Sequence, residues 1–93
     1  MLIVKKFGGT SVANKERIYN VARRCIEDYK KGHSVVVVLS AMGDTTDDLL
    51  ALANDINPNT NKRELDMLLT TGEQVSVSLM AMAMHAMDVP AVS

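Results

Sequence analysis

The feature that most limits how this chain can fold is the uninterrupted apolar run VVVVL that follows Ser34 and ends at residue 39. A half-buried strand alternates apolar and polar residues, whereas this run offers apolar side chains to both of its sides. Strands of this kind are typical of parallel sheets that helices cover on each face. The run SVVVVL therefore predicts an internal strand of an α/β domain.

A strand and a helix are predicted before this run. The stretch LIVKKF at residues 2–7 is apolar and partly β-branched, as strands are. An apolar stripe with helical spacing follows, and it comprises Ile18, Val21, Ala22, Cys25, Ile26 and Tyr29. Asn14 is the expected N-cap of this helix, and Gly32 is the expected stop.

Two helices and a third strand are predicted in the second half. A helix should run from about Thr45 into Asp55, with Thr45 and Asp48 forming a capping box. Its inward residues should be Leu49, Leu50, Ala53 and Ile56. A longer helix over about residues 62–87 is apolar on two sides, so it should be buried in a core or against a partner. Its two faces comprise Val75, Leu79, Met82 and Ala86, and Val77, Met80, Met84 and Met87. The ending VPAVS, residues 89–93, should be the third strand.

The predicted order is β-α-β-α-α-β with long helical connections. Such connections make neighbouring strands parallel, with right-handed crossovers and helices on both faces of the sheet. The predicted fold class is therefore α/β with a parallel sheet. The 93 residues leave room for one domain, and the third strand comes at their end, so we expect them to be part of something longer.

Composition excludes several classes of function. A net charge of −1 argues against a nucleic acid or an acidic membrane surface as partner, because both favour a basic patch. We expect no signal peptide and no spanning helix, since MLIV is short and two lysines follow it. The single cysteine, Cys25, fits a reducing compartment such as the cytoplasm, and we expect it in the core. No Cys and His cluster suggests a metal site.

The stretch KFGGTS at residues 6–11 separates the first strand from the first helix. Open α/β sheets bind ligands at this end of their strands. Glycines there let backbone N–H groups approach an anion, and a lysine supplies a point charge for phosphate oxygens. The spacing matches neither the P-loop nor the dinucleotide fingerprint. The alternative is a strand-ending turn with a solvated lysine.

The stretch LSAMGDTT at residues 39–46 is a second loop of the same kind. It follows a strand, contains a glycine and offers the hydroxyls of Ser40, Thr45 and Thr46. Loops after adjacent parallel strands lie side by side, so this loop should lie next to the first. The alternative is that Thr45 and the aspartates only cap the following helix, which leaves Thr46 without a role.

The stretch TTGEQ at residues 70–74 interrupts a helical pattern with Gly72, which costs about 1 kcal/mol against alanine. A glycine tolerated there often marks the close approach of another group. Glu73 lies within turns that should face the core, and a buried carboxylate requires a partner. We therefore expect Glu73 to meet a cation, with a solvent-facing glutamate as the equal alternative.

Taken together, KFGGTSV, VVVVLSAMGDTTDDLL and MLLTTGEQVS resemble, in order, the signatures of the aspartokinase branch of the amino-acid kinase family. The resemblance covers nearly all of the chain. It implies the three-layer sandwich of the amino-acid and carbamate kinases. It also implies ATP-dependent phosphorylation of the L-aspartate β-carboxylate to 4-phospho-L-aspartate, the first step of lysine, threonine and methionine biosynthesis and a source of diaminopimelate.

The resemblance also implies roles for individual residues. Lys6 would be catalytic, contacting the transferring phosphate together with Phe7, Gly8 and Gly9. The aspartate would be held by Ser40, Thr46 and Glu73, with Glu73 on its α-ammonium. ATP with Mg²⁺ is the implied cofactor, the metal being held mainly by the nucleotide and by parts beyond these residues. The complete enzyme would be a cytoplasmic homo-oligomer.

The family's enzymes are several times longer than this chain. Residues 1–93 therefore resemble the N-terminal part of a kinase domain, without a regulatory ACT domain, and we expect them to be inactive alone. Acetylglutamate kinase and glutamate 5-kinase are alternatives within the family, although KFGGTS with TTGE favours aspartate. A non-catalytic module that dimerises through the methionine-rich helix is the alternative of a different class.

Overall fold

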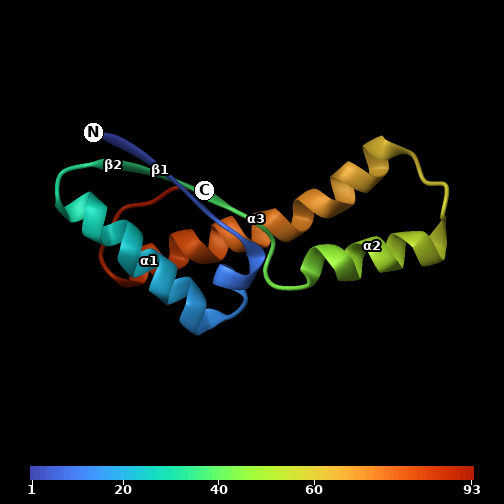
Figure 1. The fold of residues 1–93 in the computed structure, drawn as a ribbon, viewed down its shortest axis with the longest axis horizontal. Coiled ribbons are helices and arrows are strands. Elements are labelled where there is room, and N and C mark those ends of the chain that lie inside the picture. Colours follow the sequence, from blue (N-terminus) through green and yellow to red (C-terminus); the bar gives the residue numbers. More distant parts are fainter.

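The computed structural model describes residues 1–93 as an elongated molecule with extents of 49 × 25 × 17 Å. Its elements are β1 (Leu2–Phe7), the 3-10 helix η1 (Gly9–Val12), α1 (Lys15–Lys30), β2 (Ser34–Leu39), α2 (Thr45–Ile56) and α3 (Lys62–Ala86). Figure 1 shows the strands and α1 gathered at one end, while α2 and the first half of α3 form a hairpin that extends from the other.

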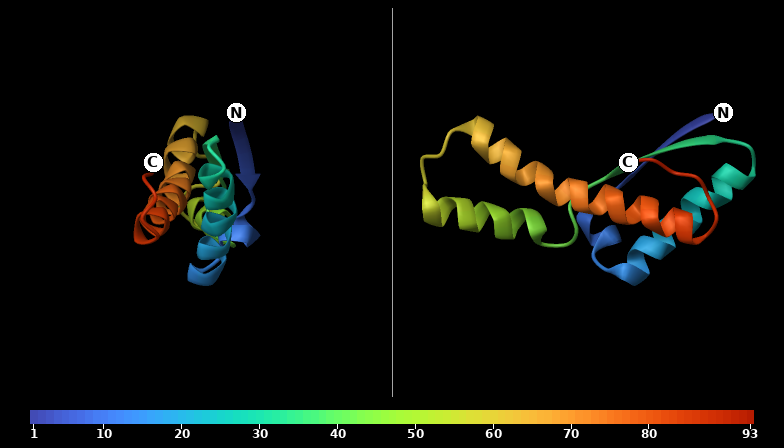
Figure 2. Two further views of the ribbon diagram at one scale, coloured as in Figure 1. Left: turned by 90° about the vertical axis from the view of Figure 1, so that its left-hand side faces the viewer. Right: turned by 180° about the vertical axis from the view of Figure 1, so that it is seen from behind.

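The strands β1 and β2 pair in parallel, with Leu2 opposite Ser34 and Phe7 opposite Leu39. The predicted β-α-β unit is thus confirmed, because α1 connects two parallel neighbours. Both α1 and α3 pack against β2, and the views of Figure 2 show α3 crossing α1. The sheet and the helices together bury one apolar cluster, which forms the core of the molecule.

The strands alternate in burial along their length instead of being covered on both sides. The side chains facing the helices, such as Ile3 and Val37, are half-buried. The opposite face carries exposed apolar side chains, namely Leu2, Val4, Val36 and Val38. Within these residues the helices therefore cover one face of the sheet and leave the other exposed.

Helix α1 follows its predicted stripe. Ile18, Val21, Ala22, Cys25 and Ile26 are buried, whereas Tyr29 is 44% exposed. The Asn14 side chain caps the helix by accepting a hydrogen bond from the backbone N–H of Arg17 at 3.0 Å. Gly32 follows the helix with a φ of +93°, a conformation that favours glycine, so both predicted ends are confirmed.

Helix α3 buries one of its two apolar faces within this chain. Met80 and Met84 belong to the core, and Val77 and Met87 pack against it. The other face remains exposed, and its large members are Val75, Leu79 and Met82. The predicted helix is confirmed, but within this chain only one of its two apolar sides is buried.

The prediction for α2 is partly wrong. The helix begins at Thr45, but its N-cap is Asp44, whose side chain makes no capping hydrogen bond, so no capping box forms. No residue of α2 is buried, and Leu50 and Ile56 are exposed. The physical reason is that α2 packs along one side, mainly on α3, and a single helix cannot enclose a full apolar stripe.

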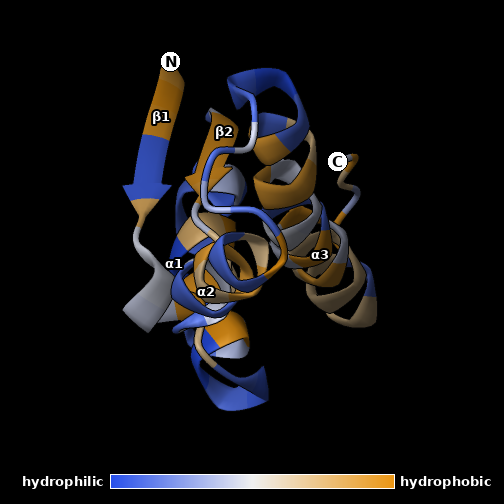
Figure 3. Cartoon of the chain, turned by 90° about the vertical axis from the view of Figure 1, so that its right-hand side faces the viewer, coloured by the Kyte–Doolittle hydropathy of each residue, from blue (hydrophilic) through white to orange (hydrophobic).

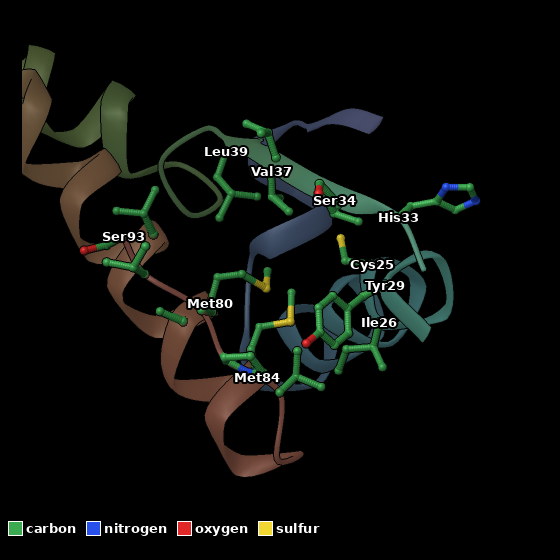
Figure 4. Close-up of a pocket in the computed structure, with 18 residues that line it drawn as sticks. Cys25, Ile26, Tyr29, His33, Ser34, Val37, Leu39, Met80, Met84 and Ser93 are labelled. Atoms are coloured by element: carbon green, nitrogen blue, oxygen red, sulfur yellow. The ribbon is translucent and has the colours of Figure 1, made fainter. Parts of the chain in front are cut away.

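The predicted third strand is also wrong for these residues. Residues 89–93 have no ladder hydrogen bonds with β2, and Pro90 has no N–H to donate to one. The chain turns at Asp88, where φ is +60°, and Ala91 O lies 2.8 Å from His85 Nε2. An apolar cavity of about 580 Å³ lies between this ending, β2, α1 and α3 (Figure 4).

An ion pair between Lys5 and Asp28 ties β1 to the end of α1. The hydrogen bond between them lowers the pKa of Asp28 and raises the pKa of Lys5 from their ordinary values. A lowered carboxyl pKa stabilises the fold above the unfolded pKa of about 3.9, and this contribution disappears as the pH falls through the folded pKa. The raised pKa of Lys5 acts in the opposite direction, so its contribution is lost at strongly alkaline pH.

We therefore expect Asp28→Asn to lower the melting temperature at pH 7 and to make it less sensitive to acid below about pH 4. Thermal unfolding over a pH series measures both effects. Asp55→Asn is the control, because Asp55 is exposed at the end of α2 and forms no ion pair. An Asp28→Asn protein that loses stability in acid as steeply as the wild type would contradict a stabilising role for the pair.

Candidate active site

The first two loop motifs leave the sheet at the same edge. Lys6 is the penultimate residue of β1 and is exposed, and Gly8 directly precedes η1. The backbone N–H of Ser40, just after β2, donates to the carbonyl oxygen of Phe7 at 3.2 Å. The prediction that both loops lie side by side is therefore confirmed. In Figure 3, β1 changes from hydrophobic at its start to hydrophilic where the two lysines lie, near this edge.

Gly9 brings the backbones of the two loops into direct contact. The N–H of Gly43 donates to the carbonyl oxygen of Gly9 at 3.0 Å. A Cβ on Gly9 would lie 2.7 Å from the carbonyl oxygen of Ala41 and 3.1 Å from that of Gly43. Real Cβ atoms do not come so close to a backbone oxygen, so this position requires glycine. Gly8, by contrast, has open space around it.

Gly72 brings the third motif to the same place. A Cβ on Gly72 would lie 3.0 Å from the Cβ of Ala41 and 3.2 Å from the Cγ2 of Thr45. The close approach predicted from a glycine inside a helix is therefore confirmed. Ala41 is 4% exposed and contacts both glycines, so it is the point at which the three motifs meet.

The predicted site side chains differ in their exposure. Lys6, Thr46 and Glu73 are exposed, and Phe7 and Ser40 are half-buried. The ion pairs of the chain are Lys5–Asp28 and Arg63–Glu64, so neither Lys6 nor Glu73 is neutralised by another residue. Both charges are therefore free to act on a ligand.

The expectation that Glu73 is buried beside a cation is wrong for these residues. The buried stripe of α3 runs through Gly72, Ser76 and Met80 at intervals of four residues. Glu73 lies one residue further along, a rotation of about 100° around the helix, and therefore points away from that stripe. The alternative of a solvent-facing glutamate is the one that the structure supports.

Two residues that contact these loops, Ala41 and Arg17, were not predicted from the sequence. The only indication for Ala41 is that it is a small residue between a predicted strand and a glycine, where close packing is possible. The sequence gives no indication for Arg17, because it lies on the polar side of α1. Its Nη1 nevertheless donates to the carbonyl oxygen of Thr10 at 2.8 Å.

The apolar cavity of Figure 4 is separate from this junction. Its walls include Cys25, Val37, Met80 and Met84, and none of Lys6, Ser40, Thr46 and Glu73. Burial raises the pKa of the Cys25 thiol, which agrees with its expected place in the core. The chain contains no group of three or more His, Cys, Asp and Glu residues placed to hold a metal ion. No helix combines the length and the apolar character that crossing a membrane requires.

Comparison with known proteins decides which family this arrangement represents. The sequence model of the amino acid kinase family matches residues 1–93, the whole of the chain. The chain belongs to the amino acid kinase family. The resemblance drawn from the three motifs is thereby confirmed, and the α/β fold class with it.

Relatives within the amino acid kinase family carry a narrower name. An aspartokinase of Bacillus sp. (strain MGA3) is 61% identical over 92 residues, which are 99% of this chain and 22% of that protein. An aspartokinase of Thermus thermophilus is 57% identical over 90 residues, or 97% of this chain and 22% of that protein. The chain thus spans about a fifth of the length of the curated relatives that it matches.

The structural comparison agrees with the sequence. The crystal structure of aspartate kinase from Synechocystis superposes with a TM-score of 0.96 at 54% identity. The superposition covers 99% of this chain and 16% of that structure. This amino acid kinase segment therefore has the same arrangement of strands and helices as the matching part of an aspartate kinase.

Proposed function

We propose that the complete protein carrying these residues is an aspartate kinase, which transfers the γ-phosphoryl group of ATP to the β-carboxylate of L-aspartate. The observation that carries the proposal is the meeting of the three motifs at Ala41. The glycine loop after Lys6 bonds the loop that leads to Thr45 and Thr46, and Gly72 packs on Ala41 and Thr45. The relatives at 56–61% identity, which are named aspartokinase, support the choice of acceptor. The product, 4-phospho-L-aspartate, would feed lysine, threonine and methionine biosynthesis in the cytoplasm.

The lysine and glycine loop is the proposed phosphate side of the site. Phosphoryl transfer requires the protein mainly to position the reactants and to offset their charge. Lys6 supplies an unpaired cation at the end of β1, and the backbone after Phe7 supplies N–H groups at Gly8 and Gly9. Mg²⁺ enters as part of the substrate MgATP, bound mainly through the phosphates.

The loop after β2 and the middle of α3 form the proposed aspartate side. The Glu73 carboxylate would pair with the substrate α-ammonium, and the Thr46 hydroxyl would hydrogen-bond a substrate carboxylate. Ser40, bonded through its N–H to the end of β1, would lie close to the reacting groups. Because Gly72 packs on Ala41, the position of Glu73 is fixed relative to the loop that carries Ser40 and Thr46.

Substitution of Glu73 tests this assignment. In the complete protein, Glu73→Gln keeps the shape of the side chain but removes the charge that the α-ammonium needs. A hydrogen bond between charged groups contributes about 1.5–3 kcal/mol, so we expect the KM for aspartate to rise roughly 10–100-fold. The KM for ATP should change less than about twofold, and steady-state kinetics with each substrate varied in turn measures both.

The control is Glu64→Gln, because Glu64 lies on the same helix but pairs with Arg63 at its exposed start. This variant should leave both KM values unchanged. Equal increases in the two KM values for Glu73→Gln would reject the role of Glu73 in aspartate binding.

The proposal includes assembly of the complete enzyme as a homo-oligomer. The exposed face of α3, formed by Val75, Leu79 and Met82, supports it, because an apolar stripe of this kind is usually covered in the functional state.

A further inference from the structure

The loop that follows Lys6 and Phe7 has an unusual arrangement of carbonyl groups. The carbonyl oxygen of Gly8 accepts the N–H of Ser11 at 3.1 Å, and that of Gly9 accepts the N–H of Gly43 at 3.0 Å. The next carbonyl oxygen, of Thr10, accepts Nη1 of Arg17 at 2.8 Å. Three successive carbonyl groups are thus engaged, and the third accepts its hydrogen bond from a side chain of α1.

The engaged carbonyl groups affect how the loop can bind an anion, because each peptide bond fixes the direction of the N–H that follows the carbonyl group. In a trans peptide the C=O and the following N–H point in opposite directions. Engaging the carbonyl groups of Gly8 and Gly9 therefore turns the N–H groups of Gly9 and Thr10 away from those bonds. The peptide between Thr10 and Ser11 is held at both ends, its carbonyl group by Arg17 and its N–H by the carbonyl oxygen of Gly8. Oriented N–H groups attract phosphate, whereas a carbonyl oxygen turned toward phosphate repels it.

Arg17 is itself well anchored for this task. Its backbone N–H donates to Oδ1 of Asn14 at 3.0 Å, in the first turn of α1, so the helix cap fixes its Cα. The side chain then reaches back seven residues to Thr10. Arg17 is in no ion pair, and its guanidinium makes the only side-chain hydrogen bond to residues 8–11.

We propose that Arg17 is a positioning residue for the phosphate side of the site. By holding the carbonyl group of Thr10, it fixes the loop of residues 8–11 in the conformation that receives the phosphates of MgATP. The assignment rests on the proposed function, since it names a residue that serves the nucleotide half of the same site. Arg17 acts through the loop and does not itself touch the nucleotide.

The first test is kinetic and uses the complete protein. Arg17→Met removes the hydrogen bond, and we expect the KM for MgATP to rise about tenfold, the usual effect of losing one such bond to a charged donor. The KM for aspartate should change less than about twofold. Arg17→Lys and Arg17→Gln each retain a donor and should recover part of the loss.

The control is Arg23→Met, because the Arg23 side chain bonds Asn20 on the same helix and not the loop. It should leave the KM for MgATP unchanged. If Arg17→Gln behaves like Arg17→Met while Arg17→Lys is normal, charge alone matters and the positioning role is overturned. Equal increases in both KM values for Arg17→Met would overturn it too.

The second test does not depend on activity. Amide hydrogen exchange without nucleotide should be faster at residues 9–12 in Arg17→Met than in the wild type, and unchanged in Arg23→Met. Unchanged exchange in Arg17→Met would overturn the inference even if the KM for MgATP rose. If the wild type failed to phosphorylate aspartate, the proposed function would fall, while the exchange experiment would still decide whether Arg17 fixes the loop.

Discussion

Replacing Lys6 with alanine in the complete protein should lower kcat by at least about 10²–10³-fold, the range typical of losing one electrostatic donor to a transition state. The carboxylate of aspartate and the phosphates of ATP repel one another, so a cation must offset their charge as they react. Lys6 is exposed at the end of β1 and forms no ion pair within the chain, so its charge is available for this purpose.

The control for this prediction is Lys30→Ala. Lys30 is the last residue of α1, at the opposite end of the β-α-β unit from the junction at Ala41, and it should be dispensable for kcat. Melting temperatures of both variants show whether folding is intact. A Lys6→Ala enzyme with near-normal kcat would remove Lys6 from the chemistry.

Replacing Gly9 with alanine should have the largest effect of any single methyl group added to the site. The new Cβ would lie 2.7 Å from the carbonyl oxygen of Ala41, and both atoms belong to backbone that cannot simply rotate away. Overpacking of this kind costs about 1–3 kcal/mol of folding stability. Because the loops must separate, we expect kcat/KM to fall about 10²-fold, as it does when reacting groups are misplaced by about 1 Å.

Gly8→Ala is the matched control for stability, because a Cβ there meets no atom within 4 Å. Its melting temperature should stay close to that of the wild type, while that of Gly9→Ala falls clearly. Melting temperatures that fall equally for the two variants would show that the contact of Gly9 with Ala41 does not hold the loops together.

The elements that could be predicted from the sequence are those whose cause is local. The stripe of α1 follows from the helical period, and its ends follow from the hydrogen-bonding side chain of Asn14 and the positive φ of Gly32. That the two loops lie side by side follows from the parallel direction of β1 and β2, because parallel strands end at the same edge of a sheet. The resemblance to the family rests on three motifs, each of which is conspicuous for the glycine that it contains.

The elements that could not be predicted depend on partners distant in the chain. Residues 89–93 have the composition of a strand, but a strand requires a ladder, and here a cavity lies beside β2 instead. Leu50 and Ile56 are apolar, but α2 packs mainly on α3, which leaves both exposed. The orientation of Glu73 depends on which face of α3 meets Ala41, and that contact is fixed by Gly72.

The most direct measurement is an acceptor comparison with the complete protein. Phosphoryl transfer from ATP would be followed with L-aspartate, L-glutamate and N-acetyl-L-glutamate, each over a range of concentrations. The account predicts that L-aspartate has by far the highest kcat/KM and that Lys6→Ala abolishes most of its turnover. A preference for either glutamate compound, or no transfer to any of the three, would contradict the aspartate kinase assignment.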